Sequence, residues 1–213
     1  VLLPSSTPTP TLVVSSMVFA PEELCPPIAG VEFYELQSII SQPFNVPNPF
    51  SDFGHHGVDF GSYNFRGKPL LGTSVQAVFS GEVVGIIVDR PPIGNTIILE
   101  TRYEDLPESL RSNLDINEGQ SLYHLYAHLL ESPEYWIGET VECGEEIAHI
   151  GSSQTVEAHL HLETTIGSSG YIFSSMAFYD TSATEEEQNT YLWWRTSGDL
   201  MPLDPMNLFT NFK

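Results

Sequence analysis

Short apolar runs separated by turn residues dominate the chain from Gly54 onward, and they constrain the fold more than any other feature. The runs are rich in β-branched residues, and dipeptides typical of turns, such as Ser80-Gly81 and Gly94-Asn95, separate them. Many short strands with regular turns predict a mostly β domain built on an antiparallel sheet. We expect strands at 75–78, 83–88, 96–100, 122–130, 147–150 and 159–165.

Helices are expected only as short insertions in this sheet. The sequence predicts them over 31–41, 105–114 and 183–191. Two segments, about 103–119 and 166–198, are long enough to be insertions between strands, and such insertions are usually functional or disordered. The second contains Trp193 and Trp194, and its aromatic content predicts packing, as a groove wall or an oligomer contact.

A Pro/Thr/Ser-rich stretch precedes the first predicted strand. Residues 1–20 bury little apolar surface, and we interpret them as a linker. Residues 21–213 are then one domain of moderate size. The chain begins at Val1, so we expect its natural start, with any signal peptide or anchor, to lie upstream. No stretch reaches the length of a transmembrane helix.

The charge is unusually acidic, with 28 acidic and 7 basic residues and a formal net charge of −21. Nucleic-acid binding needs a basic face, so we expect no nucleic-acid partner. Anionic membrane surfaces should repel the chain as well. The ordinary explanation is a solvated, self-repelling surface that keeps the protein soluble. A preference for cationic substrates is the weaker alternative.

The two cysteines, Cys25 and Cys143, match no metal-ligand spacing. They are either two buried free thiols or a single long-range disulfide formed in an oxidising compartment. The sequence does not decide between these alternatives. The disulfide is the hypothesis to test.

Five of the seven histidines fall in three short patterns, and these patterns carry the functional signal. They are His55-His56-Gly57-Val58-Asp59, Tyr126-Ala127-His128-Leu129 and His159-Leu160-His161. Because side chains alternate along a strand, His159 and His161 should point the same way, about 7 Å apart. One of them could bind a metal ion and the other reach its bound water. With His55 and Asp59 this makes a site of two histidines and one carboxylate that leaves a fourth position open, as in catalytic zinc sites. Taken singly, each pattern also has an ordinary structural explanation.

The three patterns, in this order, resemble the signatures of the lysostaphin-type metallopeptidases, zinc endopeptidases that cut the peptide part of bacterial peptidoglycan. Those signatures are His-x-Gly-x-Asp, Tyr-x-His-Leu and His-Leu-His. The connecting stretches resemble the family too, at 72–78 with 81–84, at 94–99, at 138–147 and at 203–206. The match extends over residues 40–165 and the last dozen residues.

The resemblance implies a fold, a reaction and a role for each residue. The fold would be the antiparallel β core called the duplicated hybrid motif. His55, Asp59 and His161 would hold one zinc ion per chain. His128 and His159 would flank the attacking water, one as general base and one or both as oxyanion stabilisers, without a choice between them. The partner would be a peptidoglycan peptide or another peptide. The domain would work outside the cytoplasm, secreted or anchored at the cell envelope.

The sequence leaves the roles of other residues near the patterns undecided. His56 and His149 are expected to be spectators. Strict alternation places His124 on the strand face of His128, where it could line a groove. Glu163 shares a face with His159 and His161, as a partner of a metal ligand or as a solvated strand residue. The loop 151–158 lacks the family's glycines and its Gly-Pro ending, which leaves the substrate open.

Two other functions compete with the enzyme. The first is a non-catalytic domain of the same fold that binds peptidoglycan or regulates a hydrolase, although this chain keeps all five key residues. The second is a biotinyl or lipoyl carrier domain, whose hairpins the turn at 138–147 also resembles. A carrier needs a lysine on a hairpin tip, and neither Lys68 nor Lys213 lies in such a setting.

Overall fold

The structure, a computed structural model, describes residues 24–46, 48, 50–61 and 65–211. The predicted linker at 1–20 lies outside these residues, and the domain boundary at 21 stays a prediction. The helical elements are α1 (Phe33–Leu36), η1 (Gln37–Ile39), η2 (Tyr103–Asp105), α2 (Glu108–Asn113), α3 (Glu185–Thr196) and α4 (Met206–Asn211). The strands are β1 (Ile40–Gln42), β2 (Gly57–Phe60), β3 (Ser74–Gln76), β4 (Gly81–Arg90), β5 (Gly94–Arg102), β6 (Gln120–Leu129), β7 (Thr140–Val141), β8 (Glu146–His149), β9 (Leu160–Ser168) and β10 (Leu200–Leu203).

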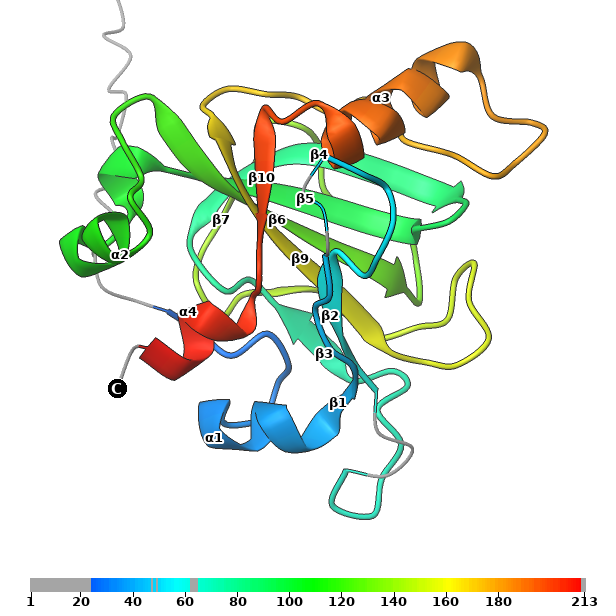
Figure 1. The fold of residues 1–213 in the computed structure, drawn as a ribbon. Coiled ribbons are helices and arrows are strands. Elements are labelled where there is room, and N and C mark those ends of the chain that lie inside the picture. Colours follow the sequence, from blue (N-terminus) through cyan, green and yellow to red (C-terminus); the bar gives the residue numbers. More distant parts are fainter. Residues whose placement is uncertain (1–23, 47, 49, 62–64, 212–213) are drawn as a thin grey trace, which may run out of the picture.

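One eight-stranded sheet organises the described part of the chain, in the order β1-β2-β9-β6-β5-β4-β7, with β10 also paired to β9 (Figure 1). Every pairing between these strands is antiparallel, which confirms the predicted fold class. Strand β9 shares one edge between two partners, because β2 pairs with 160–163 and β10 with 164–167. Strands β3 and β8 form a separate pair.

The six predicted strands all exist, as β3, β4, β5, β6, β8 and β9. Strands β1, β2, β7 and β10 were not predicted, since they have two to four residues each and β2 is buried throughout without alternation. The helix predicted over 31–41 is shorter than expected, since α1 and η1 together cover 33–39. Its helical part ends at Ile39, because Ile40 adopts an extended backbone and pairs with Phe60.

The sheet has an apolar layer on each face. Along β6, Tyr126 packs with Leu162 in the core beneath α1, α2 and α4, whereas Leu125 and Ala127 belong to the core on the other face. That second core is covered by the 166–198 segment, which contributes Phe173, Met176, Tyr191 and Trp194. The 166–198 insertion therefore packs as a layer on one face of the sheet, and its aromatic residues build that layer.

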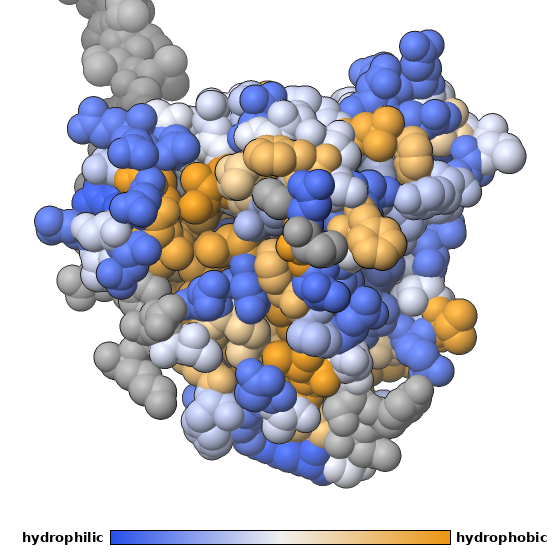
Figure 2. Space-filling view, in the orientation of Figure 1, coloured by the Kyte–Doolittle hydropathy of each residue, from blue (hydrophilic) through white to orange (hydrophobic). Residues whose placement is uncertain are grey.

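Helix α3 has two different sides. Thr184 caps its N-terminus through a hydrogen bond from the backbone N–H of Glu187, and three glutamates fill the first turn, where they favour the helix dipole. Tyr191, Trp194 and Arg195 are buried. Figure 2 shows a largely hydrophilic surface over α3 at the upper right, whereas apolar side chains gather beside α2 at the left.

A disulfide joins Cys25 and Cys143, whose Cα atoms lie 5.7 Å apart. The bond fastens the segment before α1 to the turn that follows β7. Of the two hypotheses for the cysteines, free thiols or a disulfide, the structure supports the disulfide. Among the described residues, no helix is both long enough and apolar enough to cross a membrane.

Candidate metal centre

Strand pairing brings Asp59 and His161 together. In the register of β2 with β9, Asp59 lies directly opposite His161. Gly57 permits this close approach, because a Cβ at that position would lie 2.4 Å from the Leu162 carbonyl oxygen and 2.9 Å from the ring of His161. His55 precedes β2 and is held by a two-bond backbone bridge to Asn45.

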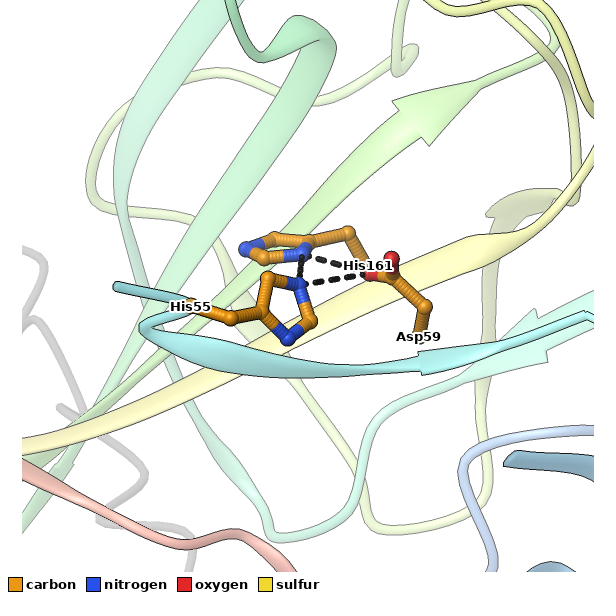
Figure 3. A group of neighbouring side chains, drawn as sticks. All are labelled: His55, Asp59 and His161. Atoms are coloured by element: carbon orange, nitrogen blue, oxygen red, sulfur yellow. Dashed lines mark hydrogen bonds and ion pairs between the residues drawn. The ribbon is translucent and has the colours of Figure 1, made fainter. Parts of the chain in front are cut away.

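The three side chains converge on one point, as Figure 3 shows. The Nε2 atom of His55 lies 3.1 Å from Oδ1 of Asp59 and 3.1 Å from Nδ1 of His161. The same Asp59 oxygen lies 2.7 Å from Nδ1 of His161. All three side chains are largely shielded from solvent, with 13%, 11% and 9% of their surfaces exposed. This group could hold a metal ion.

The outer nitrogens of the two histidines have partners of their own. Nδ1 of His55 lies 2.9 Å from the carbonyl oxygen of Pro43, and Nε2 of His161 lies 2.8 Å from Oε1 of Glu163. Both partners accept hydrogen bonds, so the outer nitrogens carry the protons in the neutral rings. The inner nitrogens then have lone pairs directed at the common point, as metal ligands require.

His128 and His159 complete a ring of four imidazoles. The ring centroid of His128 lies 4.7 Å from that of His159 and 5.8 Å from that of His161. Nδ1 of His128 donates to the Ser153 carbonyl at 2.9 Å, and Nδ1 of His159 donates to the Glu157 carbonyl at 2.8 Å. Nε2 of His159 lies 3.6 Å from Oδ1 of Asp59. In the neutral rings, Nε2 is therefore the nitrogen that can accept a proton.

An irregularity in β6 directs His128 into the centre. Its register with β5 shifts at this point, and His128 has a φ of 60°, a left-handed conformation that is rare outside glycine. The expectation that His124 shares the face of His128 was therefore wrong. His124 is buried on the opposite face, where it stacks on Phe79 and hydrogen-bonds Thr164.

The surroundings set different pKa values for these groups. Burial would raise the pKa of Asp59, but hydrogen bonds with His161 and His55 outweigh burial and hold it well below the ordinary range. Burial would lower the pKa of His161, but its bonds to Asp59 and Glu163 raise it to about 9. Burial and the neighbouring His161 lower the pKa of His128 to about 4. At neutral pH, His128 is therefore an uncharged proton acceptor.

A cleft of about 430 Å³ reaches the centre from the side of β1. Asp59 and His159 belong to its wall, and the rest includes Ser41, Leu71 and Glu157. The loop 151–158 contributes to this cleft through Glu157 and Ala158. An extended chain lying in the cleft would pass beside Asp59 and His159.

The solved structures similar to this chain include peptidases, whereas no family model and no curated protein matches it. The catalytic domain of lysostaphin from Staphylococcus simulans has 18% identity and a TM-score of 0.47, over 84% of this chain and 98% of that one. The chain resembles lysostaphin-type peptidases. The catalytic domain of the M23 protein EnpA from Enterococcus faecalis has 18% identity and a TM-score of 0.39, over 62% and 82%. A zinc-containing peptidase from Vibrio cholerae has 22% identity and a TM-score of 0.38, over 59% of this chain and 32% of that longer protein.

The fold brings together the five candidate site residues of the three signatures, which are His55, Asp59, His128, His159 and His161. Outside them, Glu163 is fully buried, so its reading as a solvated strand residue was wrong. Arg195 and Trp194, both bonded to Glu163, were missed as contributors to the centre. One signal was present in the sequence: Arg195 is among only seven basic residues of a very acidic chain.

Proposed function

We propose that this chain is a zinc-dependent endopeptidase that hydrolyses peptide bonds in bacterial cell-wall peptidoglycan. One observation carries the proposal. Four imidazoles and one carboxylate lie close together, and each imidazole is oriented by a hydrogen bond from its outer nitrogen to an oxygen acceptor. In the neutral rings of His55 and His161 the inner nitrogens then lack a proton and can serve as metal ligands.

Zinc suits the donor atoms of His55, Asp59 and His161. Two imidazole nitrogens and one carboxylate oxygen are borderline ligands that zinc accepts in sites with an open position. Ligand atoms about 2.0–2.1 Å from a tetrahedral zinc lie about 3.3 Å from one another. The separations here are 2.7 to 3.1 Å, and a small outward movement of the side chains would fit the ion. When bound, zinc lowers the pKa of water toward neutrality and polarises a carbonyl group.

His128 and His159 are proposed as the proton-transfer residues. Each has a free Nε2 that can accept a proton from the attacking water, and each is oriented through Nδ1 by a backbone carbonyl. The low pKa of His128 keeps it in the accepting form at neutral pH. A ring that has taken up a proton can donate it to the oxyanion or to the leaving amine.

The substrate and the compartment belong to the same proposal. The cleft beside Asp59 and His159 suits an extended peptide, and peptidoglycan is the peptide source that the signatures imply. The Cys25–Cys143 disulfide supports an oxidising compartment outside the cytoplasm. Residues 21–213 would form the catalytic domain behind the linker at 1–20.

Digestion of purified cell walls, followed by mass analysis of the released fragments, tests the proposal. We expect peptide fragments from zinc-loaded protein and none after chelation. His128→Ala and His159→Ala should each lower turnover by about a hundredfold or more, the scale of lost acid–base help, with zinc retained. His161→Ala should lose both zinc and activity.

His149→Ala is the matched control, because His149 is a half-exposed histidine of β8 outside the centre. Its activity should equal that of the native chain. Full activity in both His128→Ala and His159→Ala would overturn the assigned roles. Zinc-loaded protein that binds walls and releases no fragments would favour the non-catalytic wall-binding domain instead.

A further inference from the structure

Glu163 is a fully buried carboxylate that bonds to a metal-ligand candidate and to helix α3 at once. Its Oε1 accepts a hydrogen bond from Nε2 of His161 at 2.8 Å. Its Oε2 accepts from the indole N–H of Trp194 at 2.8 Å and from the guanidinium of Arg195 at 2.6 Å. None of its surface is exposed to solvent. Both oxygens of Glu163 therefore accept hydrogen bonds, and its orientation is fixed from two sides.

The same helix also holds the segment that leads to His55. Tyr191 lies three and four residues before Trp194 and Arg195, which places the three side chains on one face of α3. The hydroxyl of Tyr191 donates to Oδ1 of Asp52 at 2.9 Å, and Nε of Arg195 lies 3.7 Å from the same oxygen. Asp52 precedes His55 by three residues. One helix face thus contacts both segments that carry the histidine ligands.

Arg195 explains how a charged Glu163 can be buried. An isolated carboxylate in the interior is very unfavourable, and a close guanidinium with a good hydrogen-bond geometry offsets that cost. Without Arg195, Glu163 would have to be neutral or exposed, and a neutral group would bind the His161 N–H less strongly. Arg195 therefore acts on His161 by keeping Glu163 charged.

We propose that the 166–198 insertion is a positioning unit for the metal centre: Trp194 and Arg195 fix Glu163, and Glu163 fixes the tautomer and the ring orientation of His161. This inference rests on the proposed zinc site. Glu163, Trp194 and Arg195 are positioning residues, since they act through His161 and contact neither substrate nor the reacting atoms. Partners of this kind, bonded to a metal-bound histidine, typically change metal affinity by about 10–100-fold when removed.

Zinc affinity of the purified full chain, measured by competition with a chromophoric chelator, tests the proposal. Glu163→Gln is the main variant. Its one amide oxygen cannot serve His161, Trp194 and Arg195 together, and its NH₂ group would face a donor. We expect zinc binding about 10–100-fold weaker than in the native chain. The absorption spectrum of the cobalt-substituted variant should shift as well, because the ring of His161 is no longer held.

Glu100→Gln is the matched control, because Glu100 is a second buried glutamate among the described residues that bonds to this insertion but does not contact the centre. Its zinc affinity should equal the native value. If Glu163→Gln does not fold, Trp194→Phe decides, since it removes one N–H donor and keeps the ion pair; we expect about tenfold weaker binding. If the variant that folds binds zinc with native affinity, the positioning role is wrong and the proposed zinc site is unaffected. A native chain that binds no zinc overturns the proposed function together with it.

Discussion

The 166–198 insertion is fastened to the sheet near both of its ends by a buried glutamate, and the two attachments differ in charge. Near the first end, Glu100 of β5 accepts from the backbone N–H of Gly170 at 2.8 Å and from the hydroxyls of Ser121 and Tyr123 at 2.7 and 3.1 Å. Near the second end, Glu163 has Arg195 at 2.6 Å. The cation closest to Glu100 is Arg102, whose Nε lies 4.0 Å away at the surface.

The difference indicates which attachment has a role beyond holding the chain. Neutral donors suffice to fix the backbone at Gly170. A buried ion pair is a costly alternative, since well-packed apolar side chains of similar volume are often as stable or more stable. Its presence at Glu163 is explained by the contact with His161, whose N–H binds a charged acceptor more strongly than a neutral one. We therefore expect the two ends to respond differently to substitution.

Loss of the cation at the second end should have the largest effect on stability. Arg195→Met keeps most of the side-chain volume and leaves Glu163 buried without its ion-pair partner. We expect the free energy of unfolding to fall by about 3–5 kcal/mol, the usual cost of breaking a buried pair from one side. Denaturant unfolding of the metal-free chain measures it. A loss of less than about 1 kcal/mol would mean that Glu163 does not depend on Arg195.

The sequence predicted the centre better than it predicted this support. The first and third signatures reach into neighbouring strands, and pairing of β2 with β9 brings Asp59 into contact with His161. Arg195 reaches Glu163 from 32 residues further along the chain, through a helix whose packing no local pattern specifies. The left-handed backbone of His128 could not be predicted either. A strand irregularity interrupts the alternation of side chains along β6, and the sequence prediction depended on that alternation.

Zinc binding should depend on pH, because zinc and a proton compete for His161, the partner of Glu163. The pKa of His161 is raised to about 9 by its bonds to Asp59 and Glu163, so zinc must displace a proton from His161 below that pH. We expect apparent affinity to rise about tenfold per pH unit, or about 1.4 kcal/mol, from neutral pH and to level off above about pH 9. Titration calorimetry in buffers of different ionisation enthalpy should find about one proton released per zinc at pH 7. A pH-independent affinity between 7 and 9 would contradict this.

The link from α3 to Asp52 should contribute less. Tyr191→Phe removes only the hydroxyl that donates to Asp52 and keeps the ring, which stacks on Phe178. Hydrogen bonds to charged groups contribute about 1.5–3 kcal/mol, and partial exposure of Asp52 favours the lower figure of about 1.5 kcal/mol. Thermal unfolding measures the loss. Phe178→Leu is a useful control, because it weakens the same stack without touching Asp52.

The smallest change is expected at the first end. In Glu100→Gln, the amide oxygen can replace Oε1 and keep the bonds from Ser121, Tyr123 and Gly170. The amide nitrogen then replaces Oε2, which has no hydrogen-bond partner among the described residues. Loss of the contact with half-exposed Arg102 costs little, since pairs at the surface contribute about 0–1 kcal/mol.

We therefore expect Glu100→Gln to change the free energy of unfolding by no more than about 1 kcal/mol. Its zinc affinity and its pH dependence should stay native, because no bond connects Glu100 to a residue of the centre in the described part of the chain. Denaturant unfolding and chelator competition on one preparation give both quantities. If this variant weakened zinc binding as much as Glu163→Gln, the insertion would act on the centre through its fold as a whole, and the distinction between its two ends would be lost.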